Sequence, residues 1–168
     1  MRRRWTLVVP AAAVAAAVLG LASCGSGGGG GDALPDVPLT AMESGEVSSA
    51  ADLGGPALVN LWATYCAPCR AEMPAFQVVS DELSGIVRFV GVNQGEDGAS
   101  AQAFLDEVGV TFDQYLDENG ELADSLGVAA LPATAVVDAD GTVLTVHSGA
   151  LDAQEIRDLV AAHLTDEP

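Results

Sequence analysis

The feature that most constrains the fold is an apolar run that leads directly into a Cys-x-x-Cys pair. The run covers 57–63 and is continuous rather than alternating, which is typical of a strand buried on both faces. Cys66 and Cys69 follow it. The pattern after them predicts a helix over 66–83, with one face formed by Glu72, Met73, Phe76, Val79 and Leu83. A buried strand therefore delivers the pair to the start of a helix.

That position determines the chemistry of Cys66. The first turn of a helix has unsatisfied N–H groups and the positive end of the helix dipole, and both favour the reactive thiolate. Cys69 lies one turn further along, where a disulfide with Cys66 closes with little backbone movement. We therefore predict a redox centre in which Cys66 attacks a substrate disulfide. Cys69 then attacks Cys66 and releases the reduced substrate.

Two other readings of the pair are a structural disulfide and a metal site. A single Cys-x-x-Cys is half of a zinc site, and the sequence has no second one and no His-x-x-x-His. His147 and His163 stand apart, and we expect both at the surface. A copper chaperone that uses the two cysteines and a histidine is the binding-module alternative. We expect no metal and no cofactor, because the dithiol is itself the redox group.

The N-terminus predicts an export signal and a lipid anchor. Arginines at 2–4 precede an apolar segment over 7–21, which is short for a membrane-spanning helix. The following Leu-Ala-Ser-Cys resembles the lipobox of bacterial lipoproteins. The resemblance implies cleavage after residue 23 and lipidation of Cys24, with palmitate among the acyl chains. A plain secretory signal and an uncleaved anchor are the alternatives.

The predicted organisation is a signal peptide over 1–23, a lipidated cysteine with a glycine-rich tether over 24–33, and one domain over 34–168. This places the domain on the extracytoplasmic face of the bacterial cell membrane, where disulfides persist. From Cys24 onward, three arginines and no lysine accompany all 24 acidic residues. Such a surface disfavours nucleic acid and keeps the protein soluble. We expect the domain to be a monomer.

The rest of the domain predicts an α/β fold. Helical patterns cover 49–53, 99–108 and 118–126, and a capping box at 152–155 opens a last helix. Ala99, Ala103, Phe104 and Val108 are expected on one face of the second of these helices. The predicted extended segments are 34–40, 45–48, 87–92, 112–116, 133–137 and 143–147. A loop is expected over 93–97.

The residues around the pair resemble those of a known family. Trp-Ala-Thr-Tyr-Cys-Ala-Pro-Cys-Arg at 62–70, followed by Glu72 and Pro74, is similar to the TlpA/ResA-like thioredoxins, which are extracytoplasmic disulfide reductases. The resemblance extends over 34–164. It implies a thioredoxin fold, with a central mixed sheet flanked by helices, an N-terminal extension and a helix-and-strand insertion in the middle.

The same resemblance implies roles for residues outside the pair. Pro132 matches the cis-proline that faces the cysteines, and the backbone of Leu131 is then available to pair with a substrate strand. Glu96 follows the second strand and matches a glutamate beside the redox pair, where it takes and returns the proton of Cys69. Asp97 is its rival. Trp62 and Tyr65 flank the cysteines, either as walls of the substrate surface or as packing.

The resemblance implies a membrane-anchored enzyme that reduces disulfides in exported proteins, with electrons from a membrane thiol carrier. Apocytochrome c is a possible partner. An oxidase that introduces disulfides is the alternative direction. Members of the family often have an acidic residue at the position of Ala67, and strongly oxidising relatives have a histidine between the cysteines. This chain has neither, since Ala-Pro lies between its cysteines. The dipeptide argues against a strong oxidant without fixing the direction. A peroxiredoxin is a weaker alternative, since its reactive cysteine lies in a Pro-x-x-x-Thr-x-x-Cys setting that this chain lacks before Cys66.

Overall fold

A computed structural model describes residues 31–164 of the chain. The predicted signal peptide and the lipidated cysteine, Cys24, lie outside these residues. The strands are β1 (Pro38–Ala41), β2 (Val47–Ser49), β3 (Ala57–Trp62), β4 (Arg88–Gln94), β5 (Asp113–Asp117), β6 (Ala133–Val137) and β7 (Val143–Ser148). The helices are η1 (Ala50–Leu53, a 3-10 turn), α1 (Ala67–Glu82), α2 (Gly98–Val108), α3 (Glu121–Ser125) and α4 (Ala153–His163).

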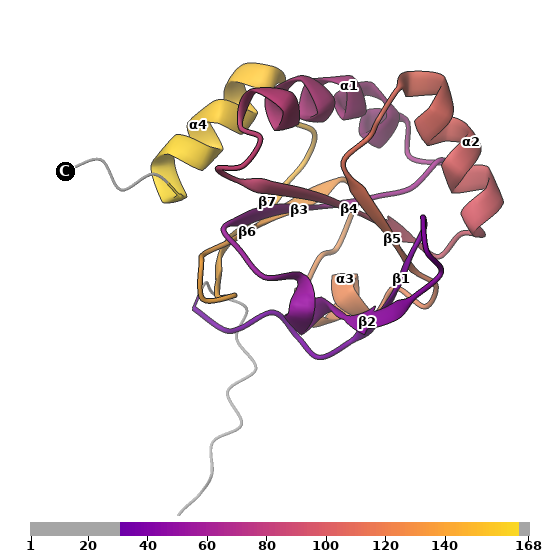
Figure 1. Cartoon of the computed structure of the whole chain (residues 1–168), viewed down its shortest axis with the longest axis horizontal. Helices are drawn as coiled ribbons and strands as arrows, with labels where there is room; N and C mark the ends of the chain where they lie inside the picture. Colours follow the sequence, from indigo (N-terminus) through magenta and orange to yellow (C-terminus); the bar gives the residue numbers. More distant parts are fainter. Residues whose placement is uncertain (1–30, 165–168) are drawn as a thin grey trace, which may run out of the picture.

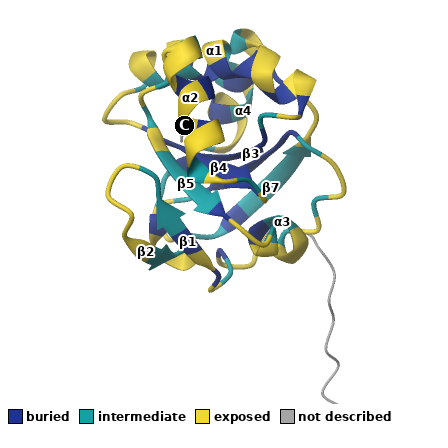
Figure 2. Ribbon diagram, turned by 90° about the vertical axis from the view of Figure 1, so that its right-hand side faces the viewer, coloured by how far each residue is buried: buried dark blue, intermediate teal, exposed yellow. Residues whose placement is uncertain are grey.

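The strands form one mixed sheet in the order β2-β1-β5-β4-β3-β6-β7. β3, β4 and β5 run parallel to one another, and β6 pairs antiparallel with β3. Helices α1, α2 and α4 cover one face of this sheet, while α3 and η1 lie on the other (Figures 1 and 2). The predicted α/β arrangement is confirmed, including the inserted helix α2 and strand β5.

β3 is the central strand, and it is apolar on both faces because both faces are covered. All six of its residues are buried. Val59 and Leu61 pack into the core on the α3 side, which also holds Leu122 of α3. Because side chains alternate along a strand, Leu58 and Trp62 point to the face of the three helices, where they pack with residues of α1.

Two sequence expectations need correction. The loop expected over 93–97 begins later, because Asn93 pairs with Trp62 and the pairing of β4 with β5 continues to Gln94. In α2 the buried face is Ala101, Phe104 and Leu105, while Ala99 and Ala103 are exposed. The ring of Phe104 lies 5.5 Å from that of Trp62, and this contact fixes which face of α2 is turned inward.

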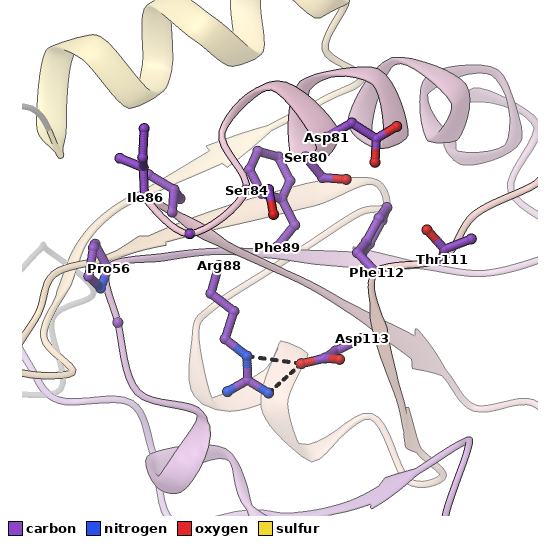
Figure 3. A pocket seen from close by; sticks show the side chains of 13 residues that line it. Pro56, Ser80, Asp81, Ser84, Ile86, Arg88, Phe89, Thr111, Phe112 and Asp113 are labelled. Atoms are coloured by element: carbon purple, nitrogen blue, oxygen red, sulfur yellow. Dashed lines mark hydrogen bonds and ion pairs between the residues drawn. The ribbon is translucent and has the colours of Figure 1, made fainter.

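The other end of the sheet holds a separate hollow. It opens at the amino ends of β3 and β4, with a volume of about 530 Å³, and Arg88 pairs there with Asp113 at 2.6 Å (Figure 3). Gly55, at its rim, precedes a cis-proline, Pro56, that the sequence analysis did not anticipate. The cysteines follow the opposite, carboxyl end of β3. Within residues 31–164, no helix is long and apolar enough to cross a bilayer.

Candidate active site

The two cysteines lie at the junction of β3 and α1 and are joined by a disulfide. Cys66 is the N-cap residue of α1, and the backbone N–H of Cys69 donates to its sulfur at 3.2 Å. Cys66 retains 8% exposure, whereas Cys69 has none. Cys66 is therefore the more accessible of the two cysteines, and once the disulfide is reduced this N–H at the helix start favours the thiolate of Cys66.

Pro132 lies at the same end of the sheet. Ala133, the first residue of β6, pairs with Leu61 of β3, so the segment before β6 passes beside the carboxyl end of β3. The Leu131–Pro132 bond is cis, as predicted. Leu131 is half-buried and packs against the apolar cluster that contains Trp62 and the cysteines. The structure thus brings Pro132 and Leu131 to the cysteines.

The two aromatic residues before the pair have different surroundings. Tyr65 is 72% exposed and stands next to Cys66. Trp62 has no exposed surface, and its indole N–H donates to Gln114 at 3.0 Å. Trp62 therefore belongs to the packing of the site, which was the alternative to a substrate wall, because α2 covers it with Phe104. Tyr65 alone of the two presents a surface to a substrate.

Glu96 lies against the loop that precedes the cysteines. Its carboxylate accepts from the backbone N–H of Thr64 at 2.6 Å, from the Thr64 hydroxyl, and from the side-chain amide of Asn93 at 2.7 Å. Glu96 thereby holds the residue two positions before Cys66. Its rival Asp97 instead caps α2, and the hydrogen bonds from Ser100 lower the pKa of that carboxyl.

Glu72 is the site residue that the sequence analysis did not assign. It follows Cys69 by three residues, which places both on one side of α1, and it is only 3% exposed. Burial raises the pKa of its carboxyl to about 7, against the opposing effect of hydrogen bonds from Asn60 and the backbone of Leu151. The signal was an acidic residue on the otherwise apolar face of the predicted helix.

The positive charge next to the cysteines, on Arg70, already has interaction partners. The guanidinium of Arg70, which follows Cys69, lies 4.3 Å from the ring centre of Phe104 and 3.6 Å from the carboxylate of Glu107. Among residues 31–164, no group of three histidine, cysteine or acidic side chains is placed to hold a metal ion. The arrangement supplies one cysteine with a small exposed surface, a second cysteine with none, and a carboxyl whose pKa lies near neutral pH.

Comparison with known proteins agrees with this chemistry. The chain is 35% identical over 134 residues to the thioredoxin-like protein YneN of Bacillus subtilis, covering 77% of this chain and 78% of that one. It is 30% identical over 132 residues to the thiol-disulfide oxidoreductase ResA of Geobacillus thermodenitrificans, covering 76% and 74%. It is 35% identical over 134 residues to the thiol:disulfide interchange protein DsbE of Pseudomonas fluorescens, covering 79% and 74%.

Solved structures agree with the fold. A putative thiol:disulfide interchange protein DsbE from Chlorobium tepidum superposes with a TM-score of 0.71 at 26% identity, covering 81% of this chain and 98% of that one. A secreted disulfide oxidoreductase of Mycobacterium tuberculosis gives 0.67 at 28% identity, covering 76% and 96%. The redoxin family matches residues 30–162. The chain therefore belongs to the redoxin family, as a thiol–disulfide oxidoreductase of the ResA and DsbE type with a thioredoxin fold.

Proposed function

We propose that this protein is a lipid-anchored reductase of disulfides in exported proteins. The observation that carries the proposal is the asymmetry of the pair: Cys66 keeps 8% exposure, Cys69 has none, and Glu72 lies one turn beyond. Cys66, the more accessible cysteine at the helix start, can attack a disulfide of a second protein. Cys69 is buried and can reach only Cys66, so it is suited to break the mixed disulfide that Cys66 forms with the substrate.

The reaction proceeds in two exchanges. The Cys66 thiolate attacks one sulfur of the substrate disulfide, and the other substrate sulfur leaves as a thiolate that takes up a proton. Cys69 then loses its proton and attacks the Cys66 sulfur, which releases the second substrate sulfur in the same way. The substrate gains two electrons and two protons, and the enzyme is left with the Cys66–Cys69 disulfide.

Glu72 is the group we assign to the proton of Cys69. A carboxyl with a pKa of about 7 takes and returns a proton at neutral pH, whereas an ordinary carboxylate is too weak a base. Glu96, the residue expected for this role from the sequence, holds Thr64 and orders the loop before Cys66. We keep Glu96 as the second candidate for proton transfer.

A substrate strand would meet the pair beside Leu131. Within residues 31–164, the backbone of Leu131 makes no hydrogen bond to another backbone group. An extended substrate segment can therefore pair with it, as in strand addition to a sheet edge. Tyr65, next to Cys66, is an exposed side chain that the same segment can contact.

The charge around the site supports the proposed reductive direction. Negative charge beside thiols raises their pKa values and so disfavours the thiolate. Strong oxidants owe their potential to a stabilised reduced form, and Glu72 and Glu96 act against such stabilisation. Electrons would come from a membrane thiol carrier, with apocytochrome c as one possible substrate and the monomer as the acting species.

Two substitutions test the chemistry in the full chain. Cys66→Ser should abolish reduction of insulin disulfides, whereas Cys69→Ser should accumulate a mixed disulfide that non-reducing electrophoresis detects. Turnover that survives in Cys66→Ser would refute the proposal. The midpoint potential of the pair tests the direction. A value near about −270 mV supports a reductant, and one of about −120 to −180 mV supports the alternative oxidase.

The anchor needs a separate test. Mass spectrometry of the protein from its host membrane should show a chain that starts at Cys24 with acyl groups attached. Cys24→Ser should move the protein from the membrane fraction to the soluble fraction, since two or more acyl chains are needed for stable attachment. An unmodified, membrane-bound Cys24→Ser protein would instead indicate an uncleaved anchor.

A further inference from the structure

A second hollow of the domain lies next to the disulfide. It has a volume of about 280 Å³, and its lining includes Tyr65 and Leu131. These residues precede Cys66 and the cis-proline Pro132 respectively, so the hollow adjoins the surface that a substrate segment has to cross. The opposite wall comes from the segment around α3. A side chain of a bound substrate would enter this hollow while its disulfide faces Cys66.

An unused hydrogen-bond acceptor lies buried beside the hollow. Gln94 lines it and is only 5% exposed. The amide nitrogen of Gln94 donates to the carbonyl of Val92 at 3.3 Å, and its oxygen Oε1 has no partner among the described residues. The Val92 carbonyl fixes this orientation, because two oxygens would repel each other. Oε1 consequently lies on the side of Gly120, where an added Cβ would stand 3.9 Å from it.

An unpaired buried acceptor is unfavourable, and a ligand that donates a hydrogen bond removes the penalty. The rim narrows the choice of ligand. Glu118 and Asp124 line the hollow and are exposed, and within residues 31–164 neither carboxylate has a hydrogen bond or ion pair. The arginines of that part of the chain are engaged with other acids, as Arg70 with Glu107, Arg88 with Asp113 and Arg157 with Glu82.

The remaining wall is apolar. Ala123, Val128 and Leu131 line the hollow, and all three are partly buried against the core below. A ligand side chain therefore needs a long aliphatic stem for this wall and a cationic head with several donors for Gln94 and the rim. Arginine meets both requirements, because its guanidinium has five N–H donors and no acceptor.

We propose that this hollow binds an arginine side chain of the substrate polypeptide close to its disulfide. The guanidinium faces the carboxylates of Glu118 and Asp124, and its stem lies on Val128 and Leu131. A small shift of the buried Gln94 side chain brings Oε1 within reach of a guanidinium N–H. The inference rests on the proposed reduction of protein disulfides by Cys66. It makes the hollow a determinant of which disulfides are reduced.

A pair of peptides tests it. Each has an internal disulfide flanked on both sides by either arginine or citrulline, the neutral isostere. The full chain, reduced and freed of reductant, is mixed with each peptide, and acid-quenched samples are separated by chromatography to give second-order rate constants. The arginine peptide should react about tenfold faster, as two ion pairs and one hydrogen bond allow. Glu118→Gln/Asp124→Asn should bring the ratio close to one, and Gln94→Met should lower it about threefold.

The control has to distinguish binding of arginine in the hollow from long-range attraction of the arginine peptide by the negative charge of the whole domain. Glu43→Gln/Asp52→Asn removes the same charge from exposed residues outside the hollow, and it should keep the tenfold ratio. An equal loss of preference in this control would overturn the inference, because long-range attraction would explain it. Equal rates for both peptides in the unmodified protein would overturn the inference alone. Reaction with neither peptide would overturn the proposed function, and the inference with it.

Discussion

The side-chain amide of Asn60 donates a 2.9 Å hydrogen bond to the carboxylate of Glu72, joining the middle of β3 to α1. The backbone N–H of Leu151, before α4, donates to the other oxygen of the same carboxylate at 3.0 Å. Both bonds favour the charged form, yet burial outweighs them and the pKa rises to about 7. A carboxyl of this kind links the stability of the fold to pH and to the chemistry of Cys69.

The first prediction concerns stability. In the unfolded chain Glu72 titrates near 4.5, and in the folded protein near 7. Because the folded pKa is raised, the stabilisation is complete below pH 4.5 and is lost as the pH rises toward 7. The loss amounts to about 3 kcal/mol, at 1.36 kcal/mol per unit. Glu72→Gln lacks this titration, so its stability relative to the unmodified protein should increase between pH 4.5 and 7.5.

Urea unfolding of the two proteins across this range measures the difference, and the other acidic residues cancel in the comparison. The midpoint alone is sufficient where the slope with urea is the same. A difference between the two proteins that does not change with pH would show that Glu72 titrates as an ordinary surface carboxyl.

The second prediction concerns the rate of exchange. If Glu72 accepts the proton of Cys69, disulfide reduction accelerates as Glu72 loses its own proton, with a midpoint near pH 7. Asn60→Leu removes a hydrogen bond that lowers the Glu72 pKa, so this midpoint should move upward by roughly half a unit to one unit. A pH profile of insulin reduction measures the shift.

The control for this prediction is the double variant Asn60→Leu/Glu72→Gln. Its pH profile should coincide with that of Glu72→Gln, because Asn60 acts on the midpoint only through the carboxyl. If the profile shifts equally with and without Glu72, Asn60 affects the titration of another group, such as Cys66, and the assignment of Glu72 fails.

Local patterns were sufficient to predict the pair, the order of strands and helices and the element boundaries to within a few residues. β3 is apolar apart from Asn60, and Cys66 is the N-cap residue of α1, so neighbouring residues in the sequence are enough to predict both features. Glu72 was not assigned because its partners come from elsewhere in the fold, with Leu151 79 residues away. The orphaned oxygen of Gln94 and the buried position of Trp62 likewise depend on packing against distant segments.

The third prediction concerns the wall of the hollow beside the disulfide. Asp117, at the end of β5, is 2% exposed and accepts from the backbone N–H groups of Glu121 and Leu122 at 3.0 and 2.9 Å. Asp117 thus accepts the free N–H groups at the start of α3, whose own N-cap residue is a glycine and has no side chain to do so. Asp117→Ala should lower the free energy of unfolding by about 1–2 kcal/mol.

Urea unfolding at pH 7 measures this loss. Asp106→Ala is the matched control, since Asp106 is exposed on α2 and, among the described residues, its carboxylate accepts only from the side chain of Gln102. It should change stability by less than about 0.5 kcal/mol. Equal losses in the two variants would mean that α3 is held by its apolar contacts and not by Asp117.

The last prediction concerns the support beneath Trp62. Gly91 in β4 leaves space for the carboxamide of Gln114, since an added Cβ would stand 2.1 Å from the Gln114 oxygen that accepts from the Trp62 indole. Gly91→Ala should displace Gln114 and leave the buried indole N–H unpaired, lowering stability by about 1–3 kcal/mol. Trp62 packs in the cluster with both cysteines, so disulfide exchange should slow as well.

Gly98→Ala is the control for this prediction. An added Cβ at Gly98 would stand 3.1 Å from a terminal methyl of Leu116, which can move, so this variant should change stability by less than about 0.5 kcal/mol. A Gly91→Ala protein as stable as this control would show that Gln114 has another position open to it and that Trp62 is held by packing alone.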